Sequence, residues 1–126
     1  MSLQNIHSAM GSLAYAIAKA DGVIQAQEKK IIKEIAQREF QLENLDIEWI
    51  EKMFVKLEQQ NTNFEDAYIF AIDTLKANKF EFDFDNSVKN KCIQFMQRVA
   101  EAFNDGSASE WNLIERFQKD ILIVLN

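Results

Sequence analysis

A chain of 126 residues with 48% hydrophobic and 27% charged residues fits one soluble globular domain, and this composition excludes a disordered or fibrous protein. The formal net charge of -6 argues against a nucleic-acid partner, because the polyanion would be repelled. The single cysteine cannot form an internal disulfide, and no apolar run approaches the ~18 residues of a membrane span. We therefore expect a cytoplasmic protein that does not insert into membranes.

Helical periodicity extends along nearly the whole sequence, and the absence of proline favours helices throughout. Apolar residues recur every three or four positions in six segments, whose stripes are, in chain order, Ile6 to Ile17, Ile31 to Phe40, Ile47 to Leu57, Ala67 to Leu75, Val88 to Phe103 and Leu113 to Leu125. Short connections separate these segments. The pattern predicts an all-α fold, a single compact bundle of about six helices that occupies residues 1–126 as one domain.

Two helix starts can be predicted from their side chains. Asn44 or Asp46 is suited to cap the third helix, since a short polar side chain can accept a free backbone N–H. Thr62 and Glu65 have the spacing of a capping box, in which each side chain satisfies a backbone N–H of the other residue. We expect the fourth helix to begin there.

The stretch "KFEFDFDN", residues 79–86, does not follow the helical period. Phe80, Phe82 and Phe84 alternate with acidic residues, and a period of two is typical of extended chain. One interpretation is a connector whose phenylalanines cover the end of the bundle. The other is a docking edge for another protein, which makes these three residues candidates for partner binding.

Two Asp-Gly pairs, Asp21-Gly22 and Asp105-Gly106, each separate two predicted helices and suggest an internal repeat. Aligning Glu28 with Glu110 places three apolar residues of one copy opposite three of the other, namely Ile31, Ile32 and Ile35 opposite Leu113, Ile114 and Phe117. The sequence therefore predicts two pseudo-repeated units, each a helix, an Asp-Gly turn and a second helix.

The aspartates of these pairs follow the C-terminal end of a helix, where the helix dipole disfavours a carboxylate by ~0.3–1 kcal/mol. One explanation is a turn in which Asp21 or Asp105 accepts nearby backbone N–H groups. In the other, each aspartate binds a cation together with the glutamate of the following helix, Glu28 or Glu110. Oxygen donors of this kind would select a hard ion such as Ca²⁺ or Mg²⁺.

Other metal sites and catalysis have little support in the sequence. The spacing after Asp21 lacks the alternating oxygen ligands of an EF-hand, and zinc would have only Cys92 and His7 as soft or imidazole ligands. Cys92 belongs to an apolar stripe and is expected to be a core thiol, while His7 is expected to be an ordinary residue near a frayed terminus. No phosphate-binding loop or nucleophile motif is present, so we expect a protein that is not an enzyme.

The segments "AKADGVIQAQEKKII" and "VAEAFNDGSASEWNLI" carry a family resemblance. The first resembles the signature of the TerB-like (tellurite-resistance) superfamily, and the second resembles the further Asp-Gly copy found in many members. The second copy departs from the pattern, with a shorter loop and Ala108 in place of the apolar Ile24. The resemblance implies an all-helical domain of bacterial stress-response systems, with a divalent cation at acidic positions that match Asp21 and Glu28, and Asp105 and Glu110.

The function expected from the residues and the resemblance together is a non-enzymatic TerB-like domain with weak divalent-cation binding. The alternative is a helical protein-interaction module without a metal. An unidentified protein partner is expected under both interpretations.

Overall fold

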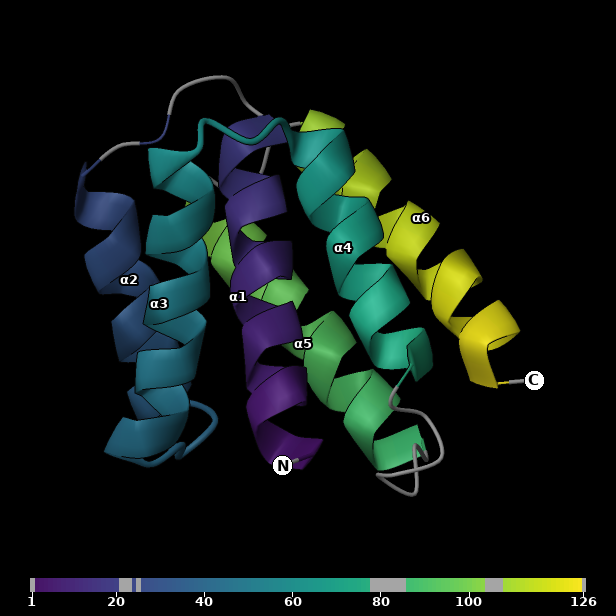
Figure 1. Ribbon diagram of the computed structural model, residues 1–126, viewed down its shortest axis with the longest axis horizontal. Coiled ribbons are helices and arrows are strands. Elements are labelled where there is room, and N and C mark those ends of the chain that lie inside the picture. Colours follow the sequence, from purple (N-terminus) through teal and green to yellow (C-terminus); the bar gives the residue numbers. More distant parts are fainter. Residues whose placement is uncertain (1, 21–23, 25, 78–85, 104–107, 126) are drawn as a thin grey trace.

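The computed structural model describes residues 2–20, 24, 26–77, 86–103 and 108–125. Within these residues the chain forms α-helices and no strand. The helices are α1 (Ser2–Ala20), α2 (Ala26–Arg38), α3 (Asn44–Gln59), α4 (Phe64–Ala77), α5 (Asn86–Ala102) and α6 (Ala108–Leu125). The predicted all-α fold with about six helices is confirmed (Figure 1).

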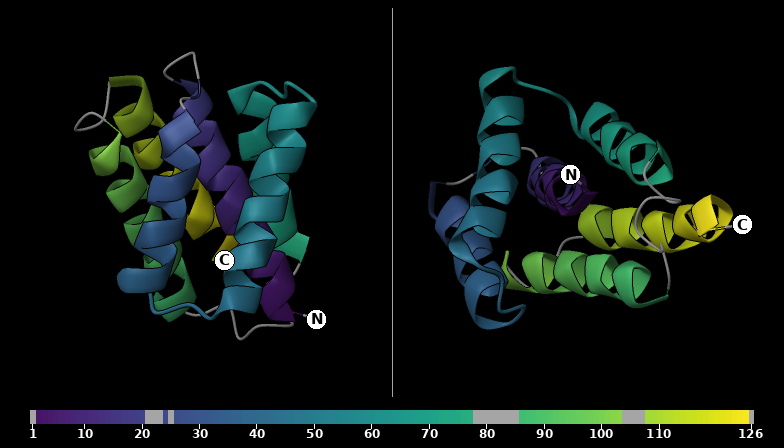
Figure 2. Two further views of the ribbon diagram at one scale, coloured as in Figure 1. Left: turned by 90° about the vertical axis from the view of Figure 1, so that its left-hand side faces the viewer. Right: turned by 60° about the horizontal axis from the view of Figure 1, so that its bottom comes forward.

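Helix α1 lies at the centre of the bundle, and the other helices surround it. It contacts α3, α4, α5 and α6, and the view along the bundle shows it enclosed by them (Figure 2). Every residue from 9 to 18 is buried. The apolar stripe from Ile6 to Ile17 predicted one buried face, whereas α1 is buried on all sides because neighbouring helices cover each of its faces.

Small side chains allow α1 to pack closely against two neighbours. A Cβ atom added to Gly11 would collide with the backbone carbonyl oxygen of Ile50 in α3. On the side facing α4, the hydroxyl of Ser12 donates a hydrogen bond of 2.6 Å to the carbonyl oxygen of Ala67. These contacts fix the position of α1 between α3 and α4.

The residues that cap α3 and α4 differ from the predicted ones by one residue or more. Helix α3 is capped by Glu43, whose backbone N–H donates to the carboxylate of Asp46 at 3.4 Å. Helix α4 begins after Asn63, whose side-chain oxygen accepts the backbone N–H of Asp66 at 2.8 Å. The predicted capping box of Thr62 and Glu65 is therefore wrong, because the Glu65 carboxylate instead pairs with a residue of α6.

Helices α2 and α6 both begin at the end of the bundle where α1 ends (Figure 1). Their buried residues match in the way that the internal alignment predicts, since Ile32 and Ile35 of α2 and Ile114 and Phe117 of α6 are all in the core. The two Asp-Gly pairs lie outside the described residues. None of the helices in the described part of the chain is both long enough and apolar enough to span a membrane.

Candidate functional site

Two of the predicted metal ligands, Glu28 and Glu110, are buried at the starts of α2 and α6. Each lies in the first turn of its helix, and their exposed fractions are 9% and 1%. Glutamate is rarely buried to this degree unless it is paired or bound to a cation. Both side chains have an interaction partner in the folded chain. The first turn of a helix also favours a carboxylate through the helix dipole.

The other predicted site residues lie outside the described part of the chain. These are Asp21 and Asp105 of the metal site, and Phe80, Phe82 and Phe84 of the partner-binding stretch. Among the described residues, no group of three or more acidic, histidine or cysteine side chains is arranged to hold a metal ion. A cation site would therefore need the aspartates as well as the glutamates, and the four-carboxylate site stays a prediction.

The donor chemistry of the buried glutamates fits the kind of ion that the sequence predicts. Carboxylate oxygens are ligands for hard cations such as Ca²⁺ and Mg²⁺, and neither imidazole nor thiolate is needed. Cys92 is fully buried, and burial raises the pKa of its thiol to about 12. The prediction that Cys92 is a core thiol is confirmed, and the thiol stays protonated at neutral pH.

His7 is buried near the start of α1, so the prediction that it lies at a frayed terminus is wrong. Its side chain lies against α3, with Nδ1 3.4 Å from the Oδ1 atom of Asp46. This Nδ1 atom has no hydrogen-bond partner among the described residues. Burial lowers the pKa of His7, and the nearby Lys91 lowers it further, while Asp46 raises it in part. His7 is therefore held as neutral imidazole at neutral pH.

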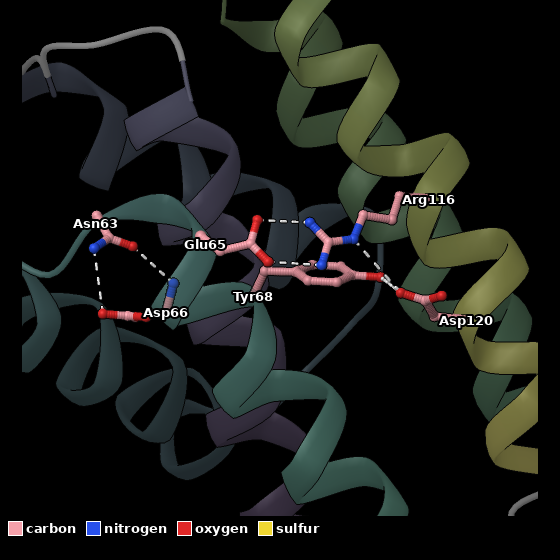
Figure 3. Close-up of polar contacts among 6 residues, drawn as sticks. All are labelled: Asn63, Glu65, Asp66, Tyr68, Arg116 and Asp120. Carbon is pink, nitrogen blue, oxygen red and sulfur yellow. Dashed lines mark hydrogen bonds and ion pairs between the residues drawn. The ribbon is translucent and has the colours of Figure 1, made fainter.

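A polar cluster that the sequence pattern does not reveal joins α4 to α6. Glu65 and Tyr68 of α4 point toward Arg116 and Asp120 of α6 (Figure 3). The guanidinium of Arg116 donates two hydrogen bonds of 2.7 Å to Glu65, and the Tyr68 hydroxyl donates one of 2.6 Å to Asp120. Arg116 also lies over the Tyr68 ring, 4.4 Å from its centroid. The cluster fixes α6 against α4 and so sets the position of the helix that carries Glu110.

The pKa values of this cluster follow from its contacts. Burial and the hydrogen bond to Asp120 raise the pKa of Tyr68, so its hydroxyl stays protonated and continues to donate. The hydrogen bonds from Arg116 lower the pKa of Glu65, which keeps that carboxylate ionised. The only sequence signal for this cluster is the spacing of four between Arg116 and Asp120, which are also an ion pair within α6.

An open groove of about 250 Å³ lies where α1 ends and α4 and α6 begin. It is lined by small, apolar and polar side chains together, namely Ala20, Phe64, Ser109, Asn112, Leu113 and Arg116. Its lining in the described part of the chain includes Ser109 but not the adjacent Glu110.

The fold and the buried glutamates define a small all-α domain with two helix pairs, each carrying an acidic residue where its second helix begins. A family model described as tellurite resistance protein TerB matches residues 7–123, which is nearly the whole chain. The chain belongs to the TerB family. No match was found among curated proteins or among solved structures.

Proposed function

We propose that this TerB domain acts without catalysis, by binding a divalent cation weakly in a cytoplasmic stress-response system of bacteria. Asp21 and Glu28 would hold the ion, and Asp105 and Glu110 would complete the site if the two turns converge. The observation that carries the proposal is the burial of Glu28 and Glu110 at equivalent positions of the two helix pairs.

Electrostatics supports a cation rather than another ligand. Moving a carboxylate from water into the protein interior is costly unless an opposite charge or hydrogen bonds offset the loss of hydration. An aspartate and a glutamate that converged at a turn would repel one another, and a divalent ion would remove that repulsion. The aspartates also follow a helix C-terminus in the sequence, where the helix dipole disfavours them. A bound Ca²⁺ or Mg²⁺ would supply positive charge for the carboxylates to share.

The test is the effect of metal on thermal stability. An ion that binds only the native state stabilises it by RT ln(1 + [L]/Kd), which is ~2.7 kcal/mol at a hundredfold excess over Kd. The melting temperature should therefore rise with millimolar Ca²⁺ or Mg²⁺. Asp21→Asn and Glu28→Gln should each remove most of this rise, whereas Glu115→Gln, at an exposed position of α6, should keep it.

A melting temperature that does not respond to metal, together with no heat in a calorimetric titration, would contradict the proposal. The acidic residues would then act as caps and turns. The same conclusion follows if Glu115→Gln removes the response as fully as Glu28→Gln does, because the effect would then be general screening of an acidic chain.

The second candidate function is a metal-free protein-interaction module. It is favoured by Ile69 and Phe70, two large apolar side chains of α4 that are exposed to solvent. Phe80, Phe82 and Phe84 are the partner-binding residues predicted from the sequence. A pull-down from the native cell with the wild-type chain and with Phe82→Ala tests that part: a protein retained only by the wild type would support it, and equal recovery would contradict it.

A further inference from the structure

Helix α4 has apolar residues on two opposite faces. One face packs into the core through Ala67, Tyr68, Ala71 and Leu75. The other consists of Asp66, Ile69, Phe70 and Asp73, all exposed and spaced as i, i+3, i+4 and i+7, and is called here the outer α4 face. Ile69 and Phe70 are 43% and 42% exposed. A helix that only covered a core would carry polar residues at these central positions.

Two carboxylates flank the apolar pair of the outer α4 face, and the exposed Lys76 lies one turn beyond the second of them. Asp66 and Asp73 are seven residues apart, so they lie about 10.5 Å apart along the helix axis. The contacts of Asp66 are with the neutral Asn63 at the start of the helix. Asp73 makes no ion pair with Lys76 or with any other described residue. The face therefore presents an apolar pair between two carboxylates that form no ion pair with a described residue.

A second copy of this chain does not suit this surface. Two outer α4 faces packed together would bring four aspartates close to one another, and like charges at an interface are repelled. The apolar area is also too small, because two side chains exposed to this extent offer roughly 150 Å² of apolar surface, whereas each partner of a stable interface buries about 800 Å², of which roughly 450 Å² is apolar. The complementary ligand is therefore smaller than a folded domain and basic.

We propose that the outer α4 face binds a short amphipathic helix of a partner protein, which carries two apolar residues between two basic residues seven positions apart. The basic residues pair with Asp66 and Asp73, and the apolar pair packs on Ile69 and Phe70. The small contact predicts a transient complex with a dissociation constant on the order of 100 µM. This partner surface rests on the interaction function proposed above and does not depend on a bound cation.

The experiment uses the full chain and a designed helical peptide of about 14 residues as the probe. The peptide carries Lys at two positions seven apart and Leu at the third and fourth positions between them, and a matched peptide carries Glu in place of both Lys. Binding is measured by fluorescence anisotropy of the labelled peptide in EDTA. We expect the wild-type chain to bind the Lys peptide, and to bind the Glu peptide at least tenfold more weakly.

Variants of the chain then locate the surface. Asp73→Lys and Phe70→Ser should each weaken binding of the Lys peptide about tenfold. Both variants should keep a cooperative thermal transition, because neither side chain belongs to the buried core. Two controls change the same kinds of residue on α3. Glu48→Lys makes the same charge change at an exposed site, and Leu45→Ser removes a side chain that is 63% exposed. Both should bind the Lys peptide as the wild type does.

Three results would overturn the inference: no binding at millimolar peptide, equal binding by wild type and Phe70→Ser, or a concentration-dependent dimer that Phe70→Ser abolishes. The third would assign the face to a second copy of the chain. The titration contains EDTA, which removes divalent cations. A negative binding result would therefore contradict the peptide surface without testing the cation site. A metal-dependent rise in melting temperature could persist while this surface binds nothing.

Discussion

Replacing Gly11 with alanine tests the central position of α1. At an exposed helical site this change would stabilise the protein by ~1 kcal/mol, because alanine has the higher helix propensity. At Gly11 the new Cβ would collide with the carbonyl oxygen of Ile50, which belongs to the backbone of α3 and cannot rotate away. The two effects have opposite signs, so the packing around α1 decides the result.

The collision should outweigh the gain in propensity. Overpacking in a well-packed core costs typically 1–3 kcal/mol, and contact with a rigid backbone atom favours the upper end of that range. We therefore expect Gly11→Ala to lower the free energy of unfolding by about 2 kcal/mol, which corresponds to a melting temperature about 6–10 °C lower for a chain of this size. Urea denaturation followed by circular dichroism at 222 nm measures the first quantity, and a thermal scan measures the second.

Ser8→Ala is the matched control for helix propensity. Ser8 lies one turn before Gly11 on α1 and is only partly buried, so its substitution should change stability by no more than ~0.5 kcal/mol. A Gly11→Ala variant as stable as the wild type, or more stable, would refute the close packing of α1 on α3.

Two polar contacts can be tested by measuring stability. Tyr68→Phe removes the hydrogen bond to Asp120 and should cost about 1 kcal/mol in urea denaturation, near the mean for one hydrogen bond, because Asp120 is partly exposed and regains water. An unchanged free energy of unfolding would contradict the role of this bond in joining α4 to α6. Since burial lowers the pKa of His7 below its ordinary value of 6.5, the stability gained from its neutral form is complete above that pH and is lost as the pH falls below it. His7→Leu should therefore make the free energy of unfolding depend less on pH just below 6.5. If the variant shows the same pH dependence as the wild type, other titrating groups cause that dependence.

The sequence predicts which segments are helical better than it predicts which helices contact one another. The apolar stripe predicted for α1 is buried as expected. The small residues Gly11 and Ser12 lie on other faces of α1, and the sequence does not show which helices pack against them. Thr62 and Glu65 fit a capping box by spacing alone, and the box fails because Glu65 pairs with Arg116, which is 51 residues away. Local spacing carries no information about such a partner.

The candidate site could be predicted in part because it repeats. The alignment of the two Asp-Gly pairs identifies Glu28 and Glu110 as equivalent, and both prove to be buried in the first turn of a helix. The burial itself could not be predicted, since a glutamate at a helix start is usually exposed. The helical spacing places Ile69 and Phe70 outside the stripe of α4 that faces the core, but it does not show that both side chains stay exposed in the folded chain.

A crystal structure of the protein grown with Ca²⁺ is the decisive test of cation binding at the Asp-Gly turns. We predict an ion at the first of these turns, with carboxylate oxygens of Asp21 and Glu28 among its ligands at about 2.3–2.6 Å. A structure in which the Asp21 carboxylate accepts the backbone N–H groups of its own turn, with no ion beside Glu28 at saturating Ca²⁺, would contradict cation binding.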